Sequence, residues 1–263
     1  MLLRVEGITR TFAGLVAVDK VSFSVAAGIV HAVIGPNGAG KTTLFNIISG
    51  LLRPTEGRLL LDDRDLTDAR AHQRTTAGLA RTFQNIRMFG GMSVLENVMT
   101  GMHPRLTVPW PAAIVRLPKA RQEERDAMTR ARALLDFVGI AGQADRPAAD
   151  LSYGDQRRLE IARALASEPK LLLLDEPAAG MNPSETTALL ALLKTLRLGG
   201  ATILLVEHDI NFVMGLSDRI TVLNFGRKIA EGSPDQVRAD PKVVEAYLGK
   251  RVAERLAREQ GRG

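Results

Sequence analysis

The sequence predicts an α/β fold in which buried parallel strands end in polar residues. Three short apolar segments support this prediction, at residues 31–34, 170–177 and 201–206, and segments with helical spacing separate them. Apolar runs of this length are typical of strands covered on both faces. In open α/β sheets, ligands bind at the carboxyl ends of the strands. We therefore expect the functional site at that edge of the sheet.

A glycine-rich loop follows the first of these strands. Residues 35–42 read GPNGAGKT and fit the pattern G-x-x-x-x-G-K-[ST], with an expected helix over 43–48. In a strand–loop–helix context the backbone N–H groups turn toward a polyphosphate, and the helix N-terminus adds a partial positive charge. The alternative, a glycine-rich turn with a surface lysine, does not explain why all four fixed positions match. The expected nucleotide contacts are Gly35, Pro36, Asn37, Gly38, Ala39, Gly40, Lys41, Thr42 and Thr43.

Composition limits the remaining classes of protein. Of the 263 residues, 45% are hydrophobic and 24% are charged, which is ordinary for a globular protein. No apolar run approaches the ~20 residues that span a bilayer, and the first residues do not resemble a signal peptide, so a cytosolic location is the default. Cysteine is absent, which excludes disulfides and cysteine-based metal sites. The net charge of +6 and the pI of about 10.0 would suit nucleic acid, an anionic membrane face or a solvated surface.

The other elements are expected from local patterns. Ser93 and Glu96 form a capping box that starts a helix, and four prolines between 103 and 118 indicate an irregular insertion. Phe12 is expected in the core on hydrophobicity alone. The basic tail, 250–263, is expected to be frayed or weakly helical. Strands are predicted over 2–34 (several), 57–61, 78–83, 219–224 and 227–230, and helices over 119–137, 157–166, 184–196 and 241–248.

Polar residues near the strand ends match the needs of ATP hydrolysis. Asp175 is placed to hold Mg²⁺ through water, and Glu176 is placed to act on the attacking water. Gln84 and His208 are candidate sensors of the γ-phosphate, Lys41 would reach the β- and γ-phosphates, and Thr42 would hold Mg²⁺. Each residue has a structural alternative, such as a helix cap, a turn or a packed histidine. Their number, order and position favour a P-loop ATPase.

Residues 151–156, which read LSYGDQ, look like the L-S-G-G-Q signature of the ATP-binding cassette (ABC) ATPases. With the motifs above, the chain resembles this family from Phe12 to about Leu248. The resemblance implies a RecA-like α/β core, an antiparallel β lobe and a helical lobe over about 90–160. Residues 1–249 would then form one ABC ATPase domain.

The resemblance also assigns roles. Phe12 takes the position of the aromatic residue that stacks on adenine, and Gln84 contacts Mg²⁺ and faces the transmembrane partner. Ser152 and Gly154 bind the γ-phosphate of ATP held by the opposite subunit, Glu176 is the general base, and His208 is the switch histidine. The chain departs from the general pattern at Tyr153, Asp155 and Asn182.

Residues 81–87, 151–161, 206–210 and 244–249 are similar to ATPase subunits of bacterial branched-chain amino acid importers. This branch also serves urea, amides and other small solutes. The resemblance implies ATP and Mg²⁺ as cofactors and two transmembrane permease subunits as partners. It also implies a second ABC ATPase subunit in a head-to-tail dimer, with a heterodimer favoured over a homodimer, and indirect cooperation with a periplasmic solute-binding protein. The expected location is peripheral, on the cytoplasmic face of the bacterial inner membrane.

Two other classes compete with this interpretation. A soluble ABC-type ATPase acting on nucleic acid or the ribosome would suit the basic pI, but such proteins usually carry two cassettes or a long coiled coil. A P-loop kinase would not explain residues 151–156, and no second substrate site is evident. We therefore expect no nucleic-acid partner.

Overall fold

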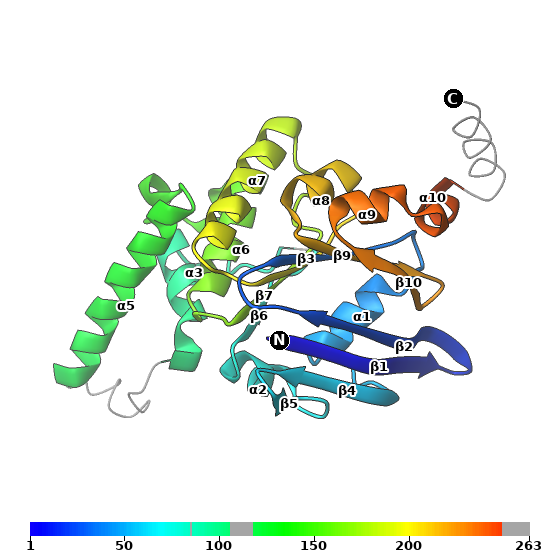
Figure 1. Cartoon of the computed structure of the whole chain (residues 1–263). Helices are drawn as coiled ribbons and strands as arrows, with labels where there is room; N and C mark the ends of the chain where they lie inside the picture. The colour runs from blue at the N-terminus through cyan, green and yellow to red at the C-terminus, as the bar shows by residue number, and fades with distance from the viewer. Residues whose placement is uncertain (85, 106–117, 249–263) are drawn as a thin grey trace.

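Two β-sheets and a group of helices make up the computed structural model, which describes residues 1–84, 86–105 and 118–248 (Figure 1). The sheet at the N-terminus is antiparallel, in the order β2-β1-β4-β5. The strand order of the second sheet is β10-β9-β3-β8-β7-β6, with β9, β3, β8, β7 and β6 parallel to their neighbours and β10 antiparallel to β9. The predicted α/β class with an antiparallel lobe is confirmed.

The strands of the antiparallel sheet are β1 (Leu3–Phe12), β2 (Leu15–Val25), β4 (Glu56–Leu61) and β5 (Arg64–Asp65). Those of the second sheet are β3 (Val30–Ile34), β6 (Leu79–Arg81), β7 (Leu171–Asp175), β8 (Ile203–Val206), β9 (Arg219–Asn224) and β10 (Arg227–Gly232). Every residue of β3, β7 and β8 is buried, as the continuous apolar runs predict for central parallel strands.

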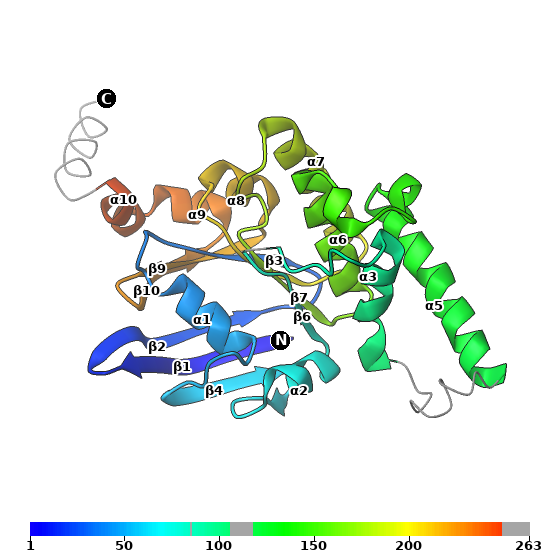
Figure 2. The same ribbon diagram turned by 180° about the vertical axis from the view of Figure 1, so that it is seen from behind.

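Helix α1 (Lys41–Ile48) lies between the two sheets (Figures 1 and 2). Its apolar residues, including Leu44 and Phe45, are buried in one core cluster with residues of both sheets. The opposite face of the parallel sheet is covered by α7 (Pro183–Leu198), α8 (Ile210–Leu216), α9 (Pro234–Ala239) and α10 (Pro241–Leu248), and α2 (Ala71–Thr76) leads into β6.

The helical lobe lies beside the sheets (Figure 2). It has its own apolar cluster. Its elements are α3 (Val94–Gly101), α5 (Pro118–Phe137) and α6 (Tyr153–Leu165), with short 3₁₀ turns at His103–Arg105, Ala141–Gln143 and Ala148–Asp150. The capping box at Ser93 and Glu96 is confirmed: Ser93 Oγ accepts from the Glu96 N–H, and the Glu96 carboxylate accepts from the Ser93 N–H. Most of the 103–118 insertion and the whole 250–263 tail lie outside the described residues.

Several elements differ from the expectations. Helix α6 begins at Tyr153 rather than 157, because Ser152 caps it by accepting a hydrogen bond from the Asp155 N–H. The short helices α2, α8 and α9 were not predicted, although Asp209 and Ser233 cap the last two. Phe12 is 38% exposed, so its expected place in the core is wrong.

Within the described ranges, no helix is long and apolar enough to cross a bilayer.

His31 on β3 makes the stability of the fold depend on pH. The side chain is fully buried, its Nε2 lies 2.8 Å from Thr221 Oγ1, and its ring packs beside Phe23. Burial is the main reason that the pKa of His31 falls from 6.5 to about 4. Between these values the unfolded chain binds a proton that the folded chain excludes, so stability is lost as the pH falls below 6.5.

We expect the free energy of unfolding to fall by about 2 kcal/mol more in the wild type than in a His31→Gln variant when the pH drops from 7 to 5. Urea denaturation of both proteins at the two pH values measures this difference. An equal change in both proteins would contradict the assignment, and His72→Gln, on an exposed position of α2, is the matched control.

Candidate active site

The glycine-rich loop runs from the end of β3 to the start of α1 and depends on the absence of side chains at two positions. A Cβ on Gly35 would lie 2.1 Å from the Leu223 carbonyl oxygen. Gly40, the N-cap of α1, has a φ of 95°, and a Cβ there would lie 2.5 Å from the Ala17 carbonyl oxygen. The loop is thus packed between β2 and β9, and a side chain at either glycine would block this path of the backbone.

Lys41 is buried at the start of α1. Its Nζ donates hydrogen bonds to the carbonyl oxygens of Gly35, at 2.7 Å, and Pro36, at 3.0 Å. Burial lowers the pKa of Lys41 below its usual value, while the Glu176 carboxylate acts in the opposite direction. The loop therefore holds the ammonium group in place through its own carbonyl groups.

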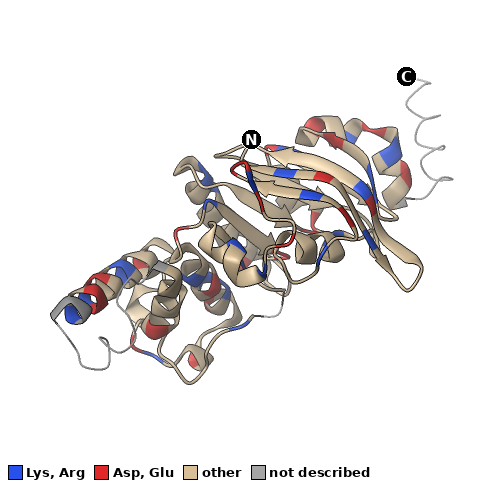
Figure 3. Ribbon diagram, turned by 90° about the horizontal axis from the view of Figure 1, so that it is seen from below, with Lys and Arg blue, Asp and Glu red and all other residues tan. Residues whose placement is uncertain are grey.

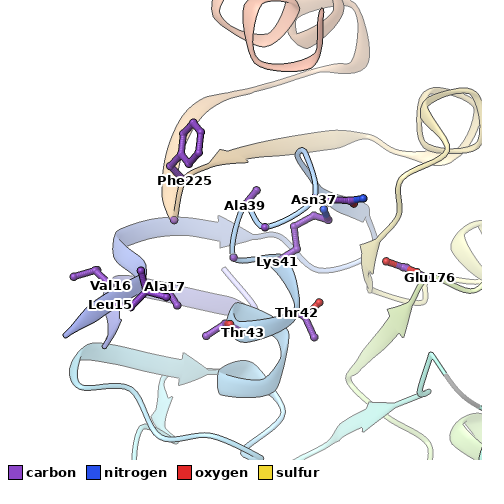
Figure 4. Close-up of a pocket in the computed structure, with 13 residues that line it drawn as sticks. Leu15, Val16, Ala17, Asn37, Ala39, Lys41, Thr42, Thr43, Glu176 and Phe225 are labelled. Atoms are coloured by element: carbon purple, nitrogen blue, oxygen red, sulfur yellow. The ribbon is translucent and has the colours of Figure 1, made fainter. Parts of the chain in front are cut away.

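A cavity of about 570 Å³ opens over this loop (Figure 4). Lys41, Thr42 and Glu176 lie toward one side of it, and Leu15, Val16 and Phe225 toward the other. The first side carries charge and hydroxyl groups, and the second is apolar. Such a division suits a ligand with a polyphosphate at one end and a flat apolar group at the other.

Glu176, Gln84 and His208 come together beside this cavity, although they are far apart in the sequence. Gln84 Nε2 donates a hydrogen bond of 2.8 Å to Glu176 Oε2. His208 Nδ1 lies 3.9 Å from the same oxygen and 3.6 Å from Glu207 Oε2. The backbone of Glu176 has a φ of 47°, a conformation that non-glycine residues rarely adopt. The structure thus brings these three predicted site residues together.

Asp175, the last residue of β7, is buried and ion-paired with Arg81 of β6. Arg81 Nη2 donates to Asp175 Oδ2 at 2.7 Å, and Arg81 Nη1 donates to Asn46 Oδ1 on α1 and to Oγ of Ser49, the C-cap of that helix. Arg81 therefore links the ends of two strands to the helix that follows the loop. The sequence analysis did not single out this arginine, because its partners are 32 to 94 residues away in the chain.

Ser152 and Gly154 lie elsewhere, at the start of α6, and neither lines the cavity of its own chain. At the same helix start, Asp155 accepts a hydrogen bond of 2.9 Å from Gln143 Nε2. Asn182, the third departure from the general pattern, caps α7 by accepting from the Glu185 N–H. These substitutions are therefore accommodated as helix-end hydrogen bonds.

The apolar side of the cavity was only partly anticipated. Phe12 lies at the end of β1, in the hairpin with β2, but outside the cavity lining. The guanidinium of Arg10 stacks on its ring at 4.6 Å. Leu15, Val16 and Phe225, all exposed, line the cavity instead. Residues 225–226 were predicted only as a hairpin turn, and the signal that was missed is a large aromatic residue at an exposed turn.

Comparisons with known proteins agree with this geometry. The family described as ABC transporter matches residues 18–179, and the family described as branched-chain amino acid ATP-binding cassette transporter matches residues 227–253. The Escherichia coli K12 protein LivG, a high-affinity branched-chain amino acid transport ATP-binding protein, is 44% identical over 95% of this chain and 98% of its own length.

Solved structures of similar fold include an ATP-binding cassette of an ABC transporter in its ADP conformation. It is 35% identical, covers 95% of this chain and 99% of its own, and gives a TM-score of 0.82. A dimeric ATP-binding cassette in a post-hydrolysis state, bound to ADP and Pi, is 26% identical over 89% of this chain and 99% of its own, with a TM-score of 0.75.

We expect Arg81→Met to lower the free energy of unfolding by about 3–5 kcal/mol, because it leaves the buried Asp175 carboxylate without its ion-pair partner. In an Asp175→Asn background the same substitution should cost about 2 kcal/mol less. Urea denaturation of the double-mutant cycle measures both values, with the exposed Arg58→Met as control. Equal losses in the two backgrounds would contradict the pairing.

Proposed function

Because the chain belongs to the ABC transporter family of ATP-binding cassettes, we propose that it is the ATP-hydrolysing subunit of an importer for branched-chain or related amino acids. The observation that carries the proposal is the hydrogen bond between Gln84 and Glu176, at the rim of the cavity that holds Lys41 and Thr42. This hydrogen bond supports the proposal because it brings a carboxylate and an amide together beside the loop that is proposed to bind the polyphosphate. LivG, whose name gives the branched-chain substrate class, supports the choice of solute.

In this proposal the glycine-rich loop, residues 35–43, binds the phosphates of ATP. Its N–H groups donate hydrogen bonds to the phosphate oxygens, and the Lys41 ammonium offsets the charge of the β- and γ-phosphates. Glu176 accepts the proton of the attacking water, while the amide of Gln84 orients that water and His208 contacts the γ-phosphate. The side chains of Gln84 and His208 lie near the same carboxylate oxygen of Glu176.

The oxygen groups at this edge fit a magnesium ion. Asp175 Oδ2 is engaged by Arg81, whereas no protein hydrogen bond is found for Asp175 Oδ1 or the Thr42 hydroxyl among the described residues. Carboxylate, hydroxyl and amide oxygens are the donors that Mg²⁺ prefers. We infer that Thr42, Asp175 and Gln84 would hold the ion. When bound, it would neutralise charge on the phosphates.

The apolar side of the cavity is proposed to take the adenine ring. Leu15, Val16 and Phe225 line that side, and Phe12, at the end of β1, lies outside the lining with the Arg10 guanidinium on one face of its ring. Stacking on such groups is tolerant of rearrangement, because a ring needs only a flat apolar face. This assignment keeps Phe12 as the stacking residue and adds its two neighbours.

Ser152 and Gly154 are proposed to act on the nucleotide of a second subunit. They stand at the N-terminus of α6, where the helix dipole favours an anion, yet they do not line their own cavity. A head-to-tail dimer would bring the α6 start of one subunit onto the cavity of the other. ATP between the subunits would then select the closed state, and hydrolysis would release it.

The assembly that follows contains two transmembrane permeases and a second cassette ATPase, with a heterodimer favoured. A periplasmic solute-binding protein would deliver the solute, and this subunit would lie on the cytoplasmic face of a bacterial inner membrane. Residues 1–249 are taken as one cassette domain with a helical lobe over about 90–160. An importer for urea, amides or another small solute is the alternative within the same branch.

The basic composition gives little support to a nucleic-acid partner. Figure 3 shows lysine and arginine interspersed with aspartate and glutamate on α5 and on the antiparallel sheet. Several of these basic side chains are paired, for example Arg4 on β1 with Asp63 and Arg132 on α5 with Asp145. A nucleic-acid site would instead require a stripe of basic groups along one face.

We expect Glu176→Gln to bind ATP and dimerise but to lower kcat for ATP hydrolysis by at least about 100-fold, because the amide cannot accept the proton of water. Steady-state phosphate release and equilibrium binding of ATP measure the two effects separately. The exposed Glu124→Gln on α5 is the control. Normal turnover in the Glu176→Gln protein would show that another group is the base.

We also expect two polytopic permeases and a second cassette ATPase to co-purify with the tagged chain from detergent-solubilised native membranes. The matching solute-binding protein should then bind leucine, isoleucine or valine more tightly than urea or short amides. Recovery of ribosomes or nucleic acid, with no membrane protein, would contradict the importer.

A further inference from the structure

Arg157 on α6 contacts two segments that the proposed reaction uses, and reaches a third through Tyr153. Its side chain is 1% exposed and its guanidinium donates hydrogen bonds to the carbonyl oxygens of Phe83 and Gln84. It also donates to the hydroxyl of Tyr153, one turn earlier on the same helix. A single buried side chain thus joins the backbone at Gln84 to the start of α6.

Glu160 also binds the backbone before Gln84. Arg157 Nη1 donates to Glu160 Oε2 at 3.0 Å, and Glu160 Oε1 accepts from the Phe83 N–H at 3.0 Å. The carbonyl oxygen of Phe83 accepts from Arg157 at 2.6 Å. Both backbone groups of Phe83 are therefore bound to the same ion pair.

Tyr153 extends the contact to the loop that follows Glu176. Its hydroxyl donates to the Ala179 carbonyl oxygen at 2.9 Å and accepts from Arg157 Nη2 at 3.3 Å. The tyrosine ring lies against Gly180, where an added Cβ would be 3.3 Å from the ring. The general signature has glycine at position 153. The hydrogen bonds that link this position to Ala179 and Arg157 therefore depend on the tyrosine found in this chain.

Stability alone is a poor reason for such a buried ion pair, because desolvation offsets most of the attraction between the charges. Burial raises the pKa of Glu160 despite the adjacent arginine, and Arg157 Nε has no partner among the described residues. The pair instead fixes the position of the backbone at Phe83 and Gln84. It binds polar atoms there that have no hydrogen-bond partner in a strand or helix.

We propose that Arg157 is a positioning residue that holds the Gln84 backbone, the loop after Glu176 and the start of α6 as one unit. This inference rests on the proposed function. When α6 meets a nucleotide on the opposite subunit, its displacement is passed through Arg157 to the hydrogen bond between Gln84 and Glu176. Turnover in one site then depends on engagement of the other.

The test removes the hydrogen bonds that join Arg157 and Glu160 to the backbone of Phe83 and Gln84 without leaving a charge unpaired. Arg157→Met with Glu160→Met replaces both partners by apolar groups of similar length, which is often neutral for stability. Tyr153→Phe removes only the hydroxyl. Arg158→Met, at the next position of α6, is the control for loss of a basic residue. Urea denaturation establishes that each variant is folded.

We expect the Arg157→Met/Glu160→Met protein to lose about 10- to 100-fold in kcat, with the dissociation constant for ATP changed by less than about threefold. Tyr153→Phe should lower kcat by a smaller factor, and Arg158→Met should leave it unchanged. In a Gln84→Ala background the double substitution should have less than about a twofold further effect, because Arg157 acts through Gln84. Amide exchange at residues 79–84 should accelerate in the double variant.

An active, folded double variant with wild-type kcat would overturn the role of Arg157 and leave the proposed function intact. The same conclusion would follow if the loss in kcat were equally large in the Gln84→Ala background, or if amide exchange were unchanged. A wild-type chain without ATPase activity would overturn the proposed function and this inference together.

Discussion

The parallel pairing of β3 with β8, and of β8 with β7, is the constraint on which the whole site depends. Ala32 pairs with Leu205, and Leu174 pairs with the same residue from the other side, so these strands end at one edge. The loop to Lys41, the acidic pair at Asp175 and the turn to His208 follow directly from those ends. A shift in this register would separate the Lys41 ammonium from the carboxylates of Asp175 and Glu176, even if the helices kept their positions.

The helical lobe is connected to this edge by both apolar and polar contacts. Helix α6 places Ile161 in the apolar cluster of the parallel sheet, while Arg157 and Glu160 bind the backbone before Gln84. An apolar interface tolerates sliding, whereas hydrogen bonds to specific backbone atoms have a defined length and direction. The orientation of the lobe relative to the backbone before Gln84 is therefore defined chiefly by these hydrogen bonds. This arrangement suits a site completed by a second subunit.

Much of the fold and of the site could be predicted from the sequence, because the signals were local. Continuous apolar runs identify β7 and β8, glycine spacing identifies the loop, and Asp175, Glu176 and His208 stand next to the strands that position them. Contacts between distant segments carry no such signal. The pairing of Arg81 with Asp175, the grip of Arg157 on Phe83 and the exposed position of Phe225 each depend on the tertiary fold. Hydrophobicity alone also misplaced Phe12, because a hairpin residue beside a ligand cavity need not be buried.

A crystal structure of the Glu176→Gln variant with Mg²⁺ and ATP would test the central claim most directly. The account predicts that the terminal phosphate lies between Lys41, Gln84 and the residue at 176, with Ser152 and Gly154 of a second subunit on its other side. Adenine should lie against Phe12 and its neighbours. Nucleotide bound away from this sheet edge, or a closed site without the second subunit's α6, would contradict the account.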